Sequence, residues 1–227
     1  MFFDSTMLLL IPGMLLAFFA QWKVTSTFKK YAQVRSSGGR TGRDVARALL
    51  NAYGAGDVQV EHVPGRLSDH YDPTKRVVRL SDDVYGSDSV AALGVAAHEV
   101  GHALQHAGGY APMRWRWSLL GPANLGSTLA MPLAFIGILM GSGGIWLLDL
   151  GIILFSAVVL FQVVTLPVEF NASSRAYAHL TSVGIATPDE AAMAKKVLDA
   201  AALTYVASAA TALLSLLRLI LLRNSRD

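Results

Sequence analysis

Four long apolar stretches divide this chain of 227 residues. They lie at about 7–22, 119–140, 145–168 and 197–222, and each can cross or nearly cross the roughly 30 Å of bilayer hydrocarbon as a helix. The second and third stretches are joined by the uncharged segment 141–144, Gly-Ser-Gly-Gly, which has room only for a tight hairpin. The pattern therefore predicts about four membrane helices, two of which cross the bilayer and return.

The two outer stretches carry further signals. Asp4 is the only charge ahead of the first one, so this stretch lacks the basic region of a signal peptide, and we expect an uncleaved anchor. The last stretch contains Asp199 near its start and Arg218 near its end, and charged side chains are expensive in hydrocarbon. Part of it is therefore expected at the interface or against protein.

The polar region 23–117 has the pattern of a small α+β domain. Val45, Leu49 and Leu50 recur at helical spacing within 41–53, and Gly54 follows as a stop signal. Apolar residues alternate in 58–63, and 76–81 is rich in β-branched residues, so a sheet of two or three strands is expected. Ser87, Asp88 and Ser89 then offer N-caps for an alanine-rich helix over about 90–106.

Composition supports a membrane protein and limits its chemistry. Apolar residues make up 53% of the chain, charged residues make up 15%, and the mean hydropathy is +0.43. The chain has no cysteine, so a metal site must use His, Asp or Glu, and disulfides and thiol nucleophiles are excluded. The net charge is only +3, and the basic residues suit flanks of membrane spans better than a nucleic-acid surface.

The alanine-rich helix carries the motif His98-Glu99-Val100-Gly101-His102. A spacing of four residues places both imidazoles on one helical face, where they can share a tetrahedral zinc ion. Glu99 falls beside the open metal position and can take a proton from the attacking water and deliver it to the leaving amine. The motif therefore predicts a hydrolytic zinc site.

A catalytic zinc ion normally has three protein ligands, so a third one must come from elsewhere. His106 lies eight residues beyond His98, about 12 Å along the helix, which is too far. The candidates are His62, His70, His179 and several carboxylates. Glu169 is the best of them, because a carboxylate at the end of the third apolar stretch needs a partner and emerges on the same side of the membrane as the motif. An interfacial ion pair between Glu169 and Arg175 is the alternative.

These residues resemble the YugP-type neutral zinc metallopeptidases, small membrane enzymes of bacteria. The resemblance covers nearly the whole chain and rests on Leu67–Pro73, Ser89–Gln105, Leu166–Ala176 and Ala202–Val206. It implies a gluzincin-like site with Glu169 as the third zinc ligand, and a layout related to the HtpX and CaaX-prenyl-protease membrane peptidases. The chain has Asn171 where the family more often has an acidic residue. If that position orients a zinc-bound histidine, the amide would do so more weakly.

Four further residues are candidates for supporting roles. Arg175 or Tyr205 could donate a hydrogen bond to the tetrahedral oxyanion. Asn171 could orient a zinc ligand, and His70, in a turn with Asp72 and Pro73, could reach the site. A strand at 77–80 could bind an extended peptide along its edge.

Together these inferences predict a mainly α integral-membrane protein with about four membrane helices and a small α+β gluzincin-like catalytic region carrying the HExxH helix. We expect five parts of one integrated domain: an anchor (1–22), the catalytic region (23–118), a transmembrane hairpin (119–168), the third-ligand region (169–196), and a membrane helix with its tail (197–227).

The predicted function is a membrane-bound endopeptidase that uses one Zn²⁺ to hydrolyse peptide bonds of membrane proteins or unfolded segments. The alternatives are an intramembrane protease and a non-catalytic zinc-binding scaffold. Partners are the lipid bilayer and a peptide or protein substrate, with no nucleic acid. Six Lys and Arg residues follow the first span within 23–43, so the positive-inside rule predicts that the catalytic region faces the cytoplasm. The resemblance implies the bacterial cell membrane, and the sequence does not indicate an oligomeric state.

Overall fold

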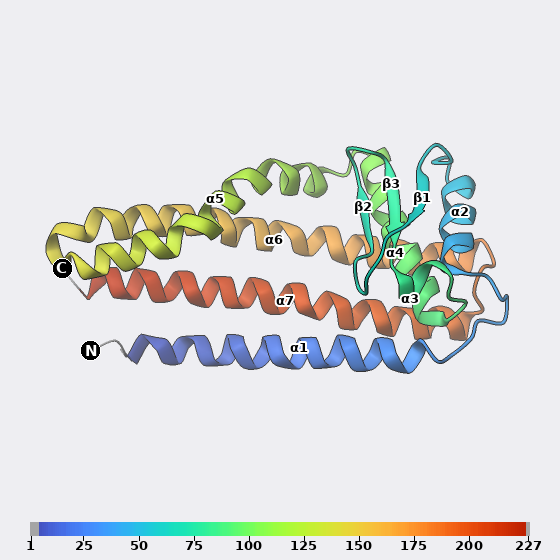
Figure 1. The fold of residues 1–227 in the computed structure, drawn as a ribbon, viewed down its shortest axis with the longest axis horizontal. Helices are drawn as coiled ribbons and strands as arrows, with labels where there is room; N and C mark the ends of the chain where they lie inside the picture. Colours follow the sequence, from blue (N-terminus) through green and yellow to red (C-terminus); the bar gives the residue numbers. More distant parts are fainter. Residues whose placement is uncertain (1–4, 226–227) are drawn as a thin grey trace. The chain divides into compact units, whose positions relative to one another are not determined.

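The computed structural model describes residues 5–225, and the chain forms two compact units. One, here called the polar unit, comprises Trp22–Tyr110 and Val168–Leu203. The other, the apolar unit, comprises Met1–Gln21, Ala111–Pro167 and Thr204–Asp227. Figure 1 labels the α-helices and the strands. The elements follow one another in the order η1 (Ser5–Leu9), α1 (Leu10–Tyr31), α2 (Gly42–Ala52), β1 (Gln59–His62), β2 (His70–Asp72), β3 (Val77–Leu80), α3 (Asp82–Tyr85), α4 (Val90–Ala107), α5 (Ala111–Leu139), η2 (Gly141–Gly144), α6 (Ile145–Ser182) and α7 (Pro188–Asn224), where η is a short 3-10 helix.

Four helical segments of the described chain are long and apolar enough to cross a membrane. They are Thr6–Tyr31, Ala111–Leu139, Gly141–Ser182 and Pro188–Asn224. Each covers one of the apolar stretches to within one residue and extends from at least one end into polar sequence, because backbone hydrogen bonding does not stop where the side chains become polar. The predicted fold class, a mainly α membrane protein with a small α+β region, is confirmed.

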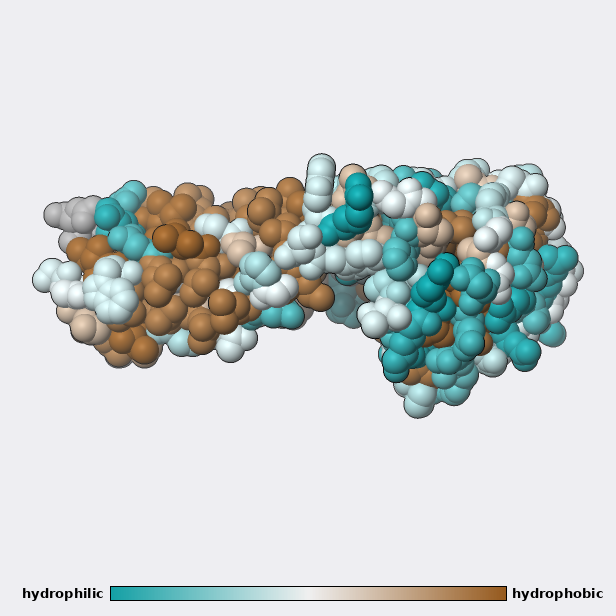
Figure 2. All heavy atoms as spheres, turned by 90° about the horizontal axis from the view of Figure 1, so that it is seen from above, coloured by the Kyte–Doolittle hydropathy of each residue, from teal (hydrophilic) through white to brown (hydrophobic). Residues whose placement is uncertain are grey.

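Glycine allows helices α5 and α6 of the apolar unit to pack backbone against backbone. A Cβ atom at Gly151 would lie only 2.8 Å from the carbonyl oxygen of Ala130, and small residues at such positions are typical of membrane helix pairs. Gly141 begins the turn between the two helices with a φ of +63°, a conformation that suits glycine. Apolar atoms predominate on the surface of this unit in Figure 2, as expected for helices that face lipid.

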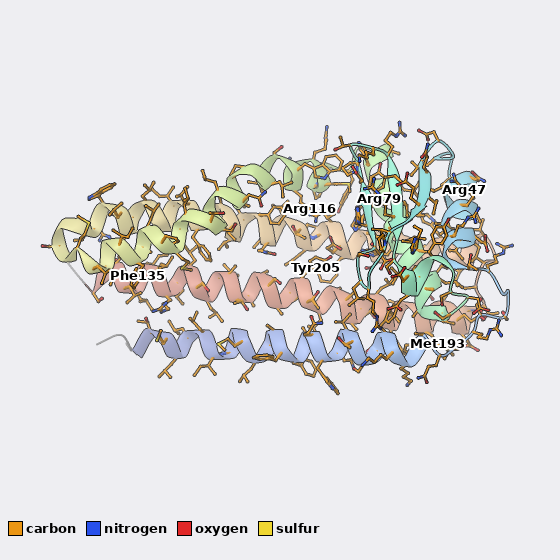
Figure 3. The ribbon with its side chains drawn as sticks, in the orientation of Figure 1. Arg47, Arg79, Arg116, Phe135, Met193 and Tyr205 are labelled. Atoms are coloured by element: carbon orange, nitrogen blue, oxygen red, sulfur yellow. The ribbon has the colours of Figure 1, made fainter. Side chains whose placement is uncertain are left out.

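The polar unit contains a three-stranded sheet in the order β1-β3-β2 (Figure 1). Strand β3 is therefore central, parallel to β1 and antiparallel to β2, which contradicts the expectation that 77–80 offers a free edge. The error arose because His70–Asp72 has turn-forming neighbours and did not stand out as a strand. Arg79 on β3, labelled in Figure 3, joins all three strands because its guanidinium donates to Glu61 on β1 and Asp72 on β2 at 3.1 and 3.0 Å.

Helix α4 begins at the predicted N-cap residues, and α2 begins directly after Thr41, at the start of the predicted helical range 41–53. Thr41 and Asp44 form a capping box at the start of α2, and the Ser89 hydroxyl accepts a hydrogen bond from the amide of Ala92 at 3.2 Å on α4. The apolar face of α2, with Val45 and Leu49, joins a fully buried core with α4 and the sheet. Helix α4 is the most enclosed element of this core, and it carries the HExxH motif.

Candidate metal centre

Helix α4 and the C-terminal part of α6 are so close at Gly101 that a larger residue at this position would collide with the backbone of α6. A Cβ atom at Gly101 would lie 2.8 Å from the carbonyl oxygen of Ala172 and 3.2 Å from its Cα. Gly101 stands inside the motif, between Glu99 and His102, and Ala172 stands three residues after Glu169. The glycine therefore lets the backbones touch at the level where the motif and Glu169 face each other.

His98, His102 and Glu169 converge at this contact. Their ligand atoms all lie within 4.8 Å of one another, and among the described residues no other group of three or more such side chains comes this close. The Glu169 carboxylate oxygen lies 3.3 Å from Nε2 of His98 and 3.6 Å from Nε2 of His102. The side chain of Glu169 is 3% exposed, that of His98 is 14% exposed and that of His102 is 9% exposed, so the three polar groups are nearly removed from water.

The other ring nitrogen of each histidine also has a partner. Nδ1 of His98 lies 3.2 Å from the hydroxyl of Ser173, and Nδ1 of His102 lies 3.0 Å from the side-chain oxygen of Gln105. Gln105 is fully buried, and its amide donates to the Val168 carbonyl at 2.8 Å, so its oxygen is the atom turned toward His102. The Gln105 oxygen can only accept, so it holds a proton on Nδ1 of His102 and leaves Nε2 to face Glu169.

Burial sets the electrostatics of the motif. Glu99 is 8% exposed, and burial raises the pKa of its carboxyl group above the ordinary glutamate value. Burial alone would lower the pKa of His102, but the hydrogen bond and negative charge of Glu169 outweigh it and raise that pKa. The site therefore concentrates two carboxylates and two imidazoles where water screens them poorly.

The donor set fits a zinc ion. Zinc binds imidazole nitrogen and carboxylate oxygen at about 2.0–2.2 Å in a tetrahedral arrangement, which separates neighbouring ligand atoms by roughly 3.3–3.6 Å. The two distances from the Glu169 oxygen to the histidine Nε2 atoms, 3.3 and 3.6 Å, match this edge. Two histidines and one carboxylate also leave a fourth position for water or substrate, as in hydrolytic zinc sites.

Asn171 and Arg175 lie next to this group without contacting the histidines by a hydrogen bond. The Asn171 side-chain oxygen accepts from Gln105 at 3.0 Å and from Arg175 at 2.8 Å. Asn171 therefore reaches His102 through Gln105. The guanidinium of Arg175 is directed to Asn171, while the ion-pair partners of Glu169 are His98 and His102.

The remaining candidate histidines contact other groups of the polar unit, and the remaining tyrosine belongs to the apolar unit. His70 is 2.7 Å from the Ser68 carbonyl, His62 is 2.6 Å from Asp82, and His106 is 2.8 Å from the Tyr71 hydroxyl. The ring of His179 lies 3.9 Å from the ring of Tyr53, centroid to centroid, with the two planes tilted by 48°. Tyr205, labelled in Figure 3, belongs to the part of α7 that lies in the apolar unit.

Sequence reasoning missed Gln105 and Ser173. Both signals were present, because Gln105 follows His102 by three residues on one helix and Ser173 follows Glu169 by four. A neutral side chain one turn from a metal ligand is common on any helix, so only the packed structure distinguishes these two residues from their neighbours.

A buried His-His-Glu group on helices of a protein with four potential membrane spans defines a class of membrane metallopeptidases, and the comparison with known families agrees. The family model described as "Putative neutral zinc metallopeptidase" matches residues 6–224, and the chain belongs to this family. A curated relative, "Putative membrane protease YugP" of Bacillus subtilis (strain 168), is 52% identical over 221 residues, which cover 96% of this chain and 97% of the relative. No solved structure matches the chain significantly. The resemblance noted from the sequence is confirmed.

Proposed function

We propose that this protein is a membrane-bound, zinc-dependent endopeptidase that hydrolyses peptide bonds in membrane proteins or in unfolded segments near the bilayer. The observation that carries the proposal is the convergence of His98, His102 and Glu169 within 4.8 Å, with Glu99 buried on the same helix. Zinc in the family description and membrane protease in the name of the relative support the same chemistry.

His98, His102 and Glu169 would hold the ion, each through one atom. A zinc ion bound by such residues supplies Lewis-acid chemistry, which polarises a carbonyl group and lowers the pKa of water. Gln105 accepts from Nδ1 of His102 and Ser173 contacts Nδ1 of His98, so that both rings keep their orientation while Nε2 of each would bind the ion.

Glu99 is the general base and then the general acid. Its carboxylate accepts a proton from the attacking water and passes it to the leaving amine, which departs neutral. Burial suits the second step, because it raises the pKa of the carboxyl group above the ordinary glutamate value and so favours the protonated form until the proton is delivered. The enclosure of α4 limits bulk water around the reacting groups.

The first test is the metal content of the detergent-purified wild type beside Glu169→Ala and His102→Ala. We expect about one zinc per chain in the wild type and loss of zinc in both variants. If Glu169→Ala kept its zinc while His102→Ala lost it, Glu169 would not be the third ligand. Cleavage of an unfolded membrane-protein substrate by the wild type, absent in Glu99→Gln with zinc retained, then distinguishes a peptidase from a zinc-binding scaffold.

We also propose that the polar unit faces the cytoplasm. Basic residues after the first span support this orientation, whereas the basic residues near the C-terminus oppose it. Arg223 forms an ion pair with Asp149 at 3.0 Å, which neutralises one of the opposing charges. Because the chain has no cysteine, Lys75→Cys and Ser142→Cys each provide a single thiol. A membrane-impermeant maleimide applied to intact cells should label position 142 and leave 75 unlabelled; the reverse pattern would refute the orientation.

A further inference from the structure

The polar unit contains a cavity of about 580 Å³ between helices α1 and α7, lined by residues separate from the metal centre. Its size is within the range of about 300–1,000 Å³ that is usual for small-molecule sites. Lining residues come from the last turns of α1 and the first half of α7. Neither helix segment contributes a residue to the His-His-Glu group, so the cavity is a separate candidate binding site.

One face of each helix forms the cavity wall. On α1 the lining residues Lys23, Ser26, Thr27 and Lys30 follow one another at intervals of three, one and three residues, which is the spacing of a single helical face. This face combines two ammonium groups with two aliphatic hydroxyl groups, and the neighbouring Tyr31 also lines the cavity. On α7 the same spacing separates Lys196, Asp199, Ala200 and Leu203. The wall is therefore cationic and hydroxylated on one side and partly apolar on the other.

The charges of the cavity do not cancel. Asp199 is the one acidic lining residue, and its two carboxylate oxygens lie 2.8 and 2.7 Å from the ammonium group of Lys195. Within residues 5–225, no carboxylate forms an ion pair with Lys23, Lys30 or Lys196, and Lys30 contacts only the ring of Tyr31 among charged or aromatic groups. Three ammonium groups thus remain available for an anion.

The cavity begins where the first membrane helix becomes polar. Trp22 is 63% exposed and directly precedes Lys23, and an exposed tryptophan next to a lysine is typical of the headgroup level of a bilayer. On α7, Ala200 and Leu203 are the apolar lining residues, and the sequence after them continues as the last apolar stretch. A ligand with a charged head and an apolar tail matches both features, whereas a free ion matches only the lysines.

We propose that this cavity binds the phosphate headgroup of an anionic phospholipid. The phosphate accepts hydrogen bonds from Lys23, Lys30 and Lys196, and the Thr27 hydroxyl on the same wall contacts the glycerol part. The Ser26 hydroxyl donates to the Lys23 carbonyl at 3.1 Å and can serve the ligand only as an acceptor. Basic pockets between membrane helices at the cytoplasmic side are a known type of lipid headgroup site. The protein would then select its lipid neighbours at a site independent of zinc.

The test is binding of fluorescent phosphatidylglycerol to the detergent-purified full-length protein, with phosphatidylcholine of the same chain length as the reference. We expect a clear preference for phosphatidylglycerol in the wild type. In Lys23→Gln/Lys196→Gln the preference should fall by roughly fivefold for each lysine removed. Arg40→Gln/Lys75→Gln removes the same charge from exposed positions outside the cavity and should keep the preference. Zinc content and circular dichroism identify variants that have folded.

Equal affinity for the two lipids in the wild type, or an equal loss in both double variants, would overturn the proposal. Soluble glycerol phosphate, inorganic phosphate and an acidic peptide serve as competitors. If one of them displaces the lipid at comparable concentration, the site recognises that anion and the lipid assignment is wrong. If the glutamine variant does not fold, Lys23→Arg/Lys196→Arg must retain the preference, and salt must weaken phosphatidylglycerol binding to the wild type more than phosphatidylcholine binding.

Discussion

Replacing Gly101 by alanine adds one methyl group at the closest approach of α4 and α6. The new Cβ would lie 2.8 Å from the Ala172 oxygen and 3.2 Å from its Cα, whereas comfortable carbon contacts begin at about 3.5 Å. The helices must separate by roughly half an ångström to relieve this contact. Because Glu169 and Ala172 share one helix and His98 and Gly101 share the other, the same movement stretches the 3.3 Å distance between Glu169 and His98.

Two opposing contributions set the change in the free energy of unfolding of Gly101→Ala. Overpacking a tight core costs about 1–3 kcal/mol, while replacing a helical glycine by alanine contributes roughly 1 kcal/mol in the other direction. We expect a net loss of about 1 kcal/mol, which lowers the melting temperature by roughly 2–4 °C for a chain of this size. Zinc affinity should fall roughly tenfold, the lower end of the effect of disturbing residues that support metal ligands.

The assay is thermal unfolding in detergent together with zinc competition against a chromophoric chelator. Gly121→Ala is the matched control, because Gly121 lies inside α5 and a Cβ there meets nothing within 4 Å. It should keep its zinc affinity and melt at the same temperature or higher. If Gly101→Ala behaves like Gly121→Ala in both measurements, the close helix contact does not set the ligand spacing.

Three further outcomes are expected. Glu99→Gln keeps its zinc but loses about 10²–10⁴ in kcat, since general acid–base catalysis contributes that much, and an unchanged kcat would remove Glu99 from the mechanism. Gln105→Leu preserves size but leaves Nδ1 of His102 without its acceptor, so chelator competition should show zinc affinity reduced by roughly 10–100-fold; unchanged affinity would make Gln105 a packing residue only. Arg79→Met breaks two ion pairs in the sheet, with Glu61 and Asp72, and should lower the melting temperature by a few degrees with zinc retained; zinc loss would show that the sheet controls the metal centre.

Local patterns predicted most elements of the polar unit. Ser89 marks the start of α4 because a cap acts on amides only two or three residues away, and the spacing of Val45 and Leu49 predicted α2. Strand β2 escaped prediction because three residues beside an Asp-Pro turn hold too little periodic signal. Its pairing with β3, which removes the free edge of β3, is a contact between segments and depends on the whole sheet.

The four apolar helices could be predicted from the length and hydropathy of the stretches along the chain, and the spacing of four residues places His98 and His102 on one helical face. The approach of Glu169 to within 3.6 Å of His102, 67 residues earlier, depends on how α4 packs on α6, and so do the contacts of Gln105 and Ser173 with the two imidazoles. The physical reason is range. Helical periodicity acts over one or two turns, whereas the approach of α4 to α6 depends on the fit of two surfaces, and the space left by the missing side chain of Gly101 is part of that fit.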